Sequence, residues 1–220
     1  MRKNLTVLVL FFTLGVVRAD LILQQKVESS TKGALTSSDQ TIKIKGSKIR
    51  VDNPGGELGE TSMIKDEKTG EITVLIHQKK MVAKQKEEAA NPTLKDRYMP
   101  AKPQDTGKAE KVGGFDARIY TWASDFGTTS EKLWVAKNFP NYEIIRADLP
   151  TLEKVNNFGN TKADQPDISK LPGMVVKSIR TEKTPEGSEQ TTTTTLISAK
   201  VEPIDASIFE APSDYKEAAR

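Results

Sequence analysis

Cysteine is absent from the 220 residues, and histidine occurs once, at position 77. Without cysteine the chain forms no disulfide, offers no thiolate nucleophile and lacks the residue on which a bacterial lipoprotein anchor is built. One histidine does not supply the several His or Cys ligands of a zinc site, and no Gly-x-Ser-x-Gly segment surrounds a serine. The sequence therefore predicts no metal, no cofactor and no catalytic residue.

Long apolar runs are also missing, apart from LTVLVLFFTLGVV near the N-terminus. That run is shorter than the roughly 20 apolar residues that a membrane-spanning helix needs. It follows the basic Arg2 and Lys3, and the small residues Val17 and Ala19 stand three and one positions before Asp20, which is the pattern of a secretory signal peptide. We expect residues 1–19 to be cleaved, an uncleaved anchor being the alternative. The mature chain is then periplasmic or secreted, soluble and not membrane-spanning.

An excess of charge of one sign is missing as well. The chain has 33 Lys and Arg against 30 Asp and Glu. The predicted signal peptide contains Arg2, Lys3 and Arg18 and no acidic residue, so the mature chain is neutral overall. Such a chain has no net field to attract nucleic acid or an anionic membrane. We expect no nucleic-acid partner, and the oligomeric state is left open.

What the mature sequence does contain is alternation of apolar and polar residues. In GSKIRVDNPGG, Ile49 and Val51 alternate with Lys48 and Arg50 before an Asn-Pro-Gly-Gly turn. This pattern predicts a strand whose apolar side faces a core or a cavity and whose charged side faces water. Similar segments recur along the mature chain and predict about ten antiparallel strands in meander order.

Two segments depart from the alternation. Residues 86–109 contain three prolines and many charges without a sustained period, which predicts a long connection. In residues 142–158, Tyr142, Ile145 and Leu149 recur at helical spacing, and Pro150 must kink or split the helix.

These elements predict a mainly β (α+β) fold in a single domain over residues 20–220. Its core is one curved antiparallel sheet, or half-open β-barrel, with a helical cover, because a large sheet of sequential hairpins twists and curls.

Six segments in this order resemble a known family: GSKIRVD (46–52), SMIKDEKTGE (62–71), GGFDARIYTW (113–122), LWVAKNFPNY (133–142), KLPGMVVK (170–177) and PIDASIFEAPSDY (203–215). The family is an uncharacterised domain of unknown function found in exported bacterial proteins. Its plan is similar to that of the periplasmic lipoprotein carriers of the LolA/LolB type. The resemblance implies a LolA-like half-barrel with an apolar inner space that is covered by helices. In the carriers, that space receives acyl chains. The Arg-Pro step of those carriers has no counterpart at Lys45 and Gly46, so their lid latch is not implied here.

We therefore predict an exported binding or carrier protein, not an enzyme, whose partner is a hydrophobic small molecule, a lipid or an acylated protein. The alternative is a non-catalytic cell-envelope module that binds another protein or has a structural role. Candidate cavity-lining residues, chosen by strand and helix face, are Ile49, Val51, Val74, Ile76, Trp122, Trp134, Ile145 and Leu149. The same residues fill a core if no ligand enters, because apolar alternation signals burial of either kind.

Overall fold

The computed structural model describes residues 20–55, 59–86, 102–124, 127–156, 166–183 and 187–218. The predicted signal peptide lies outside these residues. Most of the described part of the predicted 86–109 connection is strand, because one strand ends at Lys86 and another covers Gln104–Val112. That part of the prediction was wrong because the second strand, QDTGKAEKV, is exposed on both faces and so has no apolar alternation.

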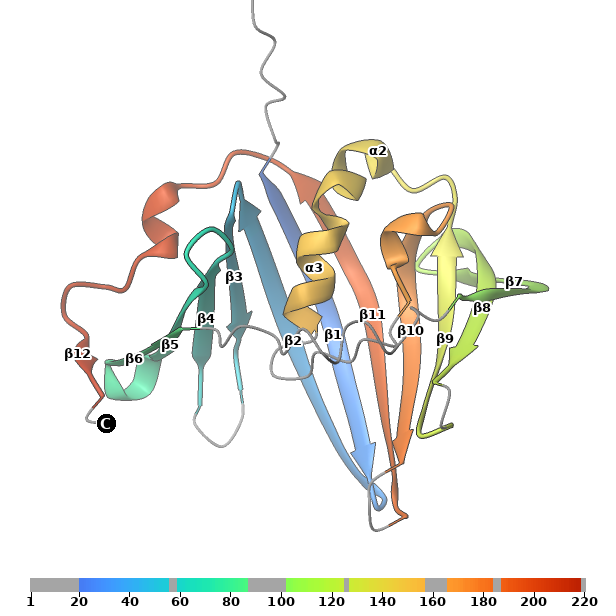
Figure 1. The fold of residues 1–220 in the computed structure, drawn as a ribbon, viewed down its shortest axis with the longest axis horizontal. Helices are drawn as coiled ribbons and strands as arrows, with labels where there is room; N and C mark the ends of the chain where they lie inside the picture. The colour runs from blue at the N-terminus through green and yellow to red at the C-terminus, as the bar shows by residue number, and fades with distance from the viewer. Residues whose placement is uncertain are drawn as a thin grey trace, which may run out of the picture.

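The described residues form twelve strands (Figure 1). They are β1 (Leu21–Thr31), β2 (Ala34–Lys45), β3 (Lys48–Asn53), β4 (Thr61–Asp66), β5 (Glu71–Ile76), β6 (Met81–Lys86), β7 (Gln104–Val112), β8 (Phe115–Ala123), β9 (Thr129–Ala136), β10 (Met174–Lys183), β11 (Glu189–Val201) and β12 (Lys216–Glu217).

All twelve strands belong to one open, curved sheet in the order β12-β6-β5-β4-β3-β2-β1-β11-β10-β9-β8-β7. Two meanders, β1 to β6 and β7 to β11, are joined where β1 pairs with β11. Every pairing is antiparallel except that of β12 with β6. The predicted mainly β fold with a curved antiparallel sheet is therefore confirmed.

Helical segments cover part of one face of this sheet, which we call the inner face (Figure 1). They are α2 (Tyr142–Ile145), the 3-10 helix η2 (Arg146–Asp148), α3 (Leu149–Asn156) and the 3-10 helix η3 (Ile168–Lys170). The expected helix is thus split as Pro150 predicted. Because a proline ring crowds the carbonyl four residues earlier, here that of Arg146, the chain tightens into a 3-10 turn at that point.

The inner face carries the main hydrophobic core. Leu23, Ile42 and Val51 occupy paired positions on β1, β2 and β3 and are almost completely buried. They pack in one cluster with Ile145 and Leu149 of the helical cover. The alternation in the sequence places these side chains on one side because successive strand residues point to opposite faces.

The opposite, outer face of β4 to β6 carries a smaller core. Ile64, Leu75 and Val82 pack there against Ile204 and Phe209 of the C-terminal segment. That segment contains the 3-10 helix η4 (Ala206–Phe209) and ends in β12 beside β6, where the 3-10 helix η1 (His77–Lys79) joins β5 to β6. We call residues 202–218 the C-terminal strap, which runs around one end of the sheet (Figure 1).

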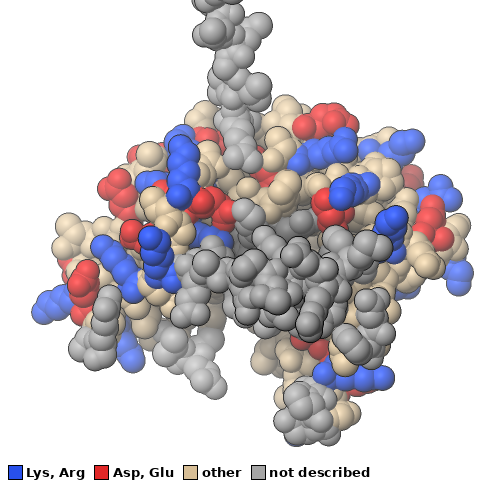
Figure 2. Space-filling model, in the orientation of Figure 1, with Lys and Arg blue, Asp and Glu red and all other residues tan. Residues whose placement is uncertain are grey.

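Basic and acidic side chains intermingle over the face of the molecule drawn in Figure 2, as expected for a chain with balanced charge. Within the described ranges, no helix has the length and apolar character required to cross a membrane.

Candidate ligand pocket

A pocket of about 130 Å³ lies between the inner face of the sheet and its helical cover. Its floor comes from β1, β2, β9, β10 and β11, and its roof from α3 and η3. The apolar lining consists of Leu23, Ile42, Leu133, Leu149, Leu152, Pro166, Ile168, Met174, Val175, Val176 and Leu196. The pocket therefore lies where the sequence predicts a covered apolar surface.

The roof is apolar because of the helical spacing in α3. Leu149 and Leu152 are three residues apart, so they project from the same side of the helix, and both are buried. At the other side of the pocket, Gly173 precedes β10, and a Cβ added there would lie 2.3 Å from the carbonyl oxygen of Ala136. Glycine at this position lets the start of β10 lie directly against the end of β9.

One end of the pocket is polar. This end is lined by Gln25, Glu131, Ser178, Arg180 and Thr194. Lys177 also lines the pocket, but its ammonium group lies over the Trp134 ring. Glu131 accepts a hydrogen bond of 3.0 Å from the indole nitrogen of Trp122, its cross-strand partner. Arg180 pairs with Glu182 at 2.8 Å.

The carboxyl group of Glu131 is a buried titratable group on the pocket wall. Burial raises the pKa of Glu131 above its usual range, against the opposing effects of Arg180, Trp122 and Ser178. A raised pKa means that the neutral acid is favoured relative to a carboxyl group in water. Perturbed carboxyl groups in a cleft mark candidate functional sites.

Of the eight predicted lining residues, Leu149 lines the pocket. Ile49, Val51 and Ile145 belong to the same core cluster as Leu149 but do not line the pocket. Val74 and Ile76 lie on β5 further along the sheet, and both are half-buried.

The two tryptophans do not share a face of the sheet. Trp122 is paired with Glu131, whereas Trp134 lies three residues beyond Glu131 on the same strand and so points the other way. Trp122 does not line the pocket itself, but its indole donates a hydrogen bond to Glu131, which does. The Trp134 ring packs beneath the ammonium groups of Lys132 and Lys177, 4.5 and 4.9 Å from its centroid.

Most of the lining was not predicted. The alternation in residues 21–27 is typical of a strand that contains Leu23, but nothing in the sequence indicates that β1 lies beside β11 and under α3. The polar residues Glu131, Ser178 and Arg180 come from two strands in regular alternation, and only the pairing of β9 with β10 brings them together. To predict this lining one would need to know how distant strands pair and in which register, and the sequence does not indicate either.

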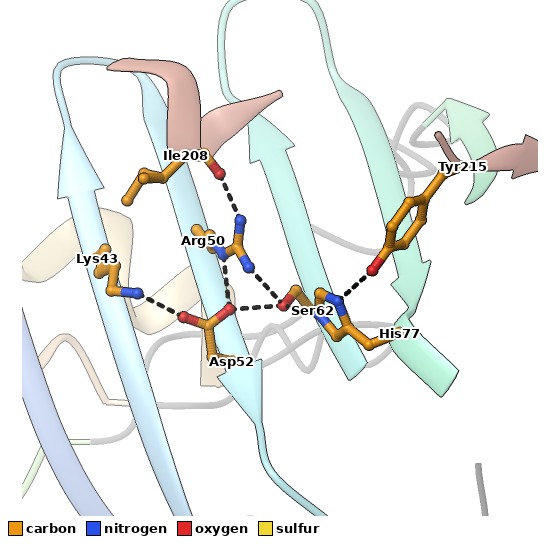
Figure 3. A network of polar contacts seen from close by, with 7 residues as sticks. All are labelled: Lys43, Arg50, Asp52, Ser62, His77, Ile208 and Tyr215. Atoms are coloured by element: carbon orange, nitrogen blue, oxygen red, sulfur yellow. Dashed lines mark hydrogen bonds and ion pairs between the residues drawn. The ribbon is translucent and has the colours of Figure 1, made fainter. Parts of the chain in front are cut away.

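A second feature is a polar network on the outer face, under the C-terminal strap (Figure 3). Arg50 donates to Asp52 at 2.6 Å, to Ser62 at 2.9 Å and to the carbonyl oxygen of Ile208 at 2.6 Å. Lys43 donates to Asp52 at 2.7 Å. The charged side of β3 was predicted to face water, and for Arg50 this is wrong, because the strap covers its side chain to 16% exposure.

The network continues through Ser62 to the single histidine. Ser62 donates to Asp52 at 2.6 Å and lies 2.7 Å from Nε2 of His77, while Nδ1 of His77 lies 2.6 Å from the Tyr215 hydroxyl. A carboxylate only accepts and Ser62 has one proton, so Nε2 of His77 must donate to Ser62. In the neutral ring, Nδ1 then accepts from Tyr215.

These hydrogen bonds attach the strap to the sheet, and they do not activate Ser62 as a nucleophile. A general base must accept the proton of its serine, whereas here the Ser62 proton is directed at Asp52 and His77 is the donor. Ser62 is also only 1% exposed. The network therefore connects β2, β3, β4 and η1 with the strap through partly buried hydrogen bonds.

Comparison with known proteins gives a family and a fold. The family model described as "Domain of unknown function (DUF4412)" matches residues 25–215, which confirms the predicted resemblance to a family of unknown function. No curated protein sequence matches the chain.

Several solved structures are similar to this chain. An uncharacterized conserved protein from Thermus thermophilus is 8% identical, with a TM-score of 0.53 over 93% of this chain and 92% of that chain. A LolA superfamily protein from Nitrosomonas europaea is 9% identical, with a TM-score of 0.37 over 88% and 90% of the two chains. A DUF1329 family protein from Desulfovibrio piger is 10% identical, with a TM-score of 0.34 over 89% and 91%. The first of these shows a shared fold.

Proposed function

The chain belongs to the DUF4412 family, whose description states no function, and we propose from its own geometry that it binds a hydrophobic molecule between α3 and the sheet. In this proposal the protein is a carrier for a lipid or for the acyl chain of a modified protein. The predicted signal peptide supports export to the periplasm or beyond.

The observation that carries the proposal is the pocket under α3. Its floor and roof are aliphatic, and a few polar groups converge at one end. Small-molecule sites have this composition, because apolar walls supply affinity and a few polar groups fix orientation.

The size of the pocket defines what enters it. A cavity of roughly 150 Å³ lined by aliphatic and aromatic side chains binds benzene, so about 130 Å³ holds a short apolar group. A longer acyl chain requires α3 to move away from the sheet. At about 0.8 kcal/mol per buried CH₂, six carbons supply roughly 5 kcal/mol before association costs of about 4 kcal/mol or more. The apolar part of the pocket alone therefore predicts weak binding.

One observation favours the alternative of a protein-interaction module. β7 is an edge strand whose side chains are exposed from Gln104 to Lys111. However, Asp105, Lys108 and Glu110 stand on this edge, and charges of this kind prevent other strands from pairing there. The pocket under α3 therefore supports ligand binding more strongly than the β7 edge supports the alternative of a protein-interaction module.

The proposal is tested by titrating the mature protein with 1-octanol while observing the methyl resonances of the pocket by NMR. We expect saturable shifts at Leu149, Leu152 and Met174, and none at Leu35, which is 69% exposed at the far end of β2. Absence of saturable shifts at the pocket methyls contradicts the proposal.

Two matched variants locate the binding. Thr194 lines the pocket and Thr193 lies on the opposite face of the same strand. Thr194→Phe fills the pocket and should abolish the shifts, whereas Thr193→Phe adds the same ring outside it and should leave them unchanged. Equal effects of the two variants contradict the proposed location.

A further inference from the structure

The charged groups near the polar end of the pocket already have partners. Arg180 pairs with Glu182 at 2.8 Å, and the carboxyl group of Glu131 accepts a hydrogen bond from the Trp122 indole at 3.0 Å. The Lys177 ammonium lies over the Trp134 ring, which points to the other face of the sheet. A head group with a full charge of either sign therefore meets an opposite charge that already has a partner.

The remaining polar groups are amides and hydroxyls. Gln25, Ser178 and Thr194 line the pocket, and each both donates and accepts hydrogen bonds. The Gln25 amide is hydrogen-bonded to Gln40, which in turn donates to Asn53 at 2.9 Å. This row of amides crosses β1, β2 and β3 on the inner face, since Gln25 and Gln40 are paired and Asn53 lies on the next strand.

The same face continues beyond the pocket with uncharged groups. Ser29 and Thr192 are cross-strand partners on the inner face of β1 and β11, two positions beyond Val27 and Thr194. Gln190 donates to the Ser29 hydroxyl at 3.2 Å. The inner face is thus apolar under α3 and rich in hydroxyl and amide groups next to it.

We infer that the ligand is an amphiphile whose head is an uncharged polyol, such as a sugar or a glycerol, seated on the Gln25 end of the pocket. This inference rests on the proposed function, because the apolar tail occupies the pocket under α3. Hydroxyl groups of a polyol both donate and accept, as do the side chains that face them. A site that hydrogen-bonds hydroxyls discriminates strongly against ligands that lack them, because its polar groups are then left unpaired.

The test compares ligands with one octyl chain and different heads, below micelle formation, in the NMR titration described above. The ligands are octyl glucoside, monooctanoylglycerol, octyl sulfate, octyltrimethylammonium and 1-octanol. We expect at least one of the two polyols to bind about tenfold or more tighter than 1-octanol and than both charged amphiphiles. The stronger of the two identifies the sugar or the glycerol source.

A matched pair of variants tests where the head group binds. Gln25→Leu removes an amide from the pocket and should weaken polyol binding about fivefold to tenfold while leaving 1-octanol binding unchanged. Gln24→Leu makes the same change on the opposite face, where Gln24 accepts from Ser198 at 2.9 Å, and should have no effect on either ligand.

The outcomes separate this inference from the proposed function. If 1-octanol binds and neither polyol binds more tightly, or if octyl sulfate or octyltrimethylammonium binds best, the polyol head is refuted and the apolar pocket stands. If no octyl ligand shifts the pocket methyls, the proposed function itself is refuted.

Discussion

Truncation of Leu149 to alanine tests whether α3 is held to the sheet by the roof of the pocket. Leu149 is 3% exposed and belongs both to the pocket lining and to the main core cluster. Replacing it removes buried aliphatic surface and leaves a larger void. Because the void joins an existing one, we expect the new space to remain open to ligand.

The expected cost follows from the burial of this side chain. Buried Leu→Ala changes cost about 2–5 kcal/mol, depending on the cavity that remains. Leu149 already borders a void on one side, so it has fewer contacts to lose than a fully packed leucine, and alanine slightly favours the helix. We therefore expect a loss of about 3 kcal/mol in the free energy of unfolding, or a fall in Tm of roughly 6–12 °C.

The assay is urea denaturation of the two proteins, with Ile144→Ala as the control. Ile144 lies on α2 and is 46% exposed, so its truncation should cost no more than about 0.5 kcal/mol. The slope of the free energy of unfolding against urea concentration should be unchanged in both variants. A loss below about 1 kcal/mol for Leu149→Ala, or an equal loss for the two variants, shows that Leu149 does not bind α3 to the sheet.

Three further predictions concern the polar groups. Tyr215→Phe removes the hydroxyl that bonds to His77 and should lower the free energy of unfolding by about 1–2 kcal/mol. Hydrogen exchange at the Lys216 and Ala218 amides should accelerate more than exchange in β1. Unchanged exchange at these two amides would show that Tyr215 does not attach the strap. Burial would raise the pKa of Asp52, but hydrogen bonds from Lys43, Ser62 and Arg50 hold it below its ordinary value of 3.8. The stability that Asp52 contributes is thus present above pH 3.8 and lost as the pH falls through its native pKa. In the Asp52→Asn variant the free energy of unfolding should therefore fall less steeply as the pH is lowered, and an unchanged fall contradicts this. Burial raises the pKa of Glu131, so the stability linked to its neutral form is complete below its ordinary value of 4.5 and lost as the pH rises; Glu131→Gln should therefore raise Tm at pH 7 more than at pH 4, and the reverse order refutes the assignment.

The alternation in the sequence was enough to predict the sheet and the inward-facing side chains of β3. Ile49 and Val51 are buried there at 1% and 2% exposure, as their spacing requires. The helical spacing of Ile145 and Leu149 likewise predicted the helical cover to which both belong. These predictions depend on local periodicity, and local periodicity is what a single sequence records.

The remaining features depend on contacts between distant segments. Arg50 and Ile208 are 158 residues apart in the chain, and nothing in KIRV indicates that a strap covers its charged side. The polar end of the pocket arises from the register of β9 and β10, which is set by the sheet as a whole. β7 was missed because an edge strand exposed on both faces has no apolar face to reveal it.

The most direct test of a ligand seated between α3 and the sheet is the measurement of NOEs between octyl-chain protons and protein methyl groups in the complex with 1-octanol. We predict NOEs to Leu149 on the roof and to Leu23 and Ile42 on the floor, from the same octyl chain. An octyl chain that shows NOEs to exposed methyls such as those of Leu35 or Ile197, and none to Leu149 and Leu23, contradicts the account.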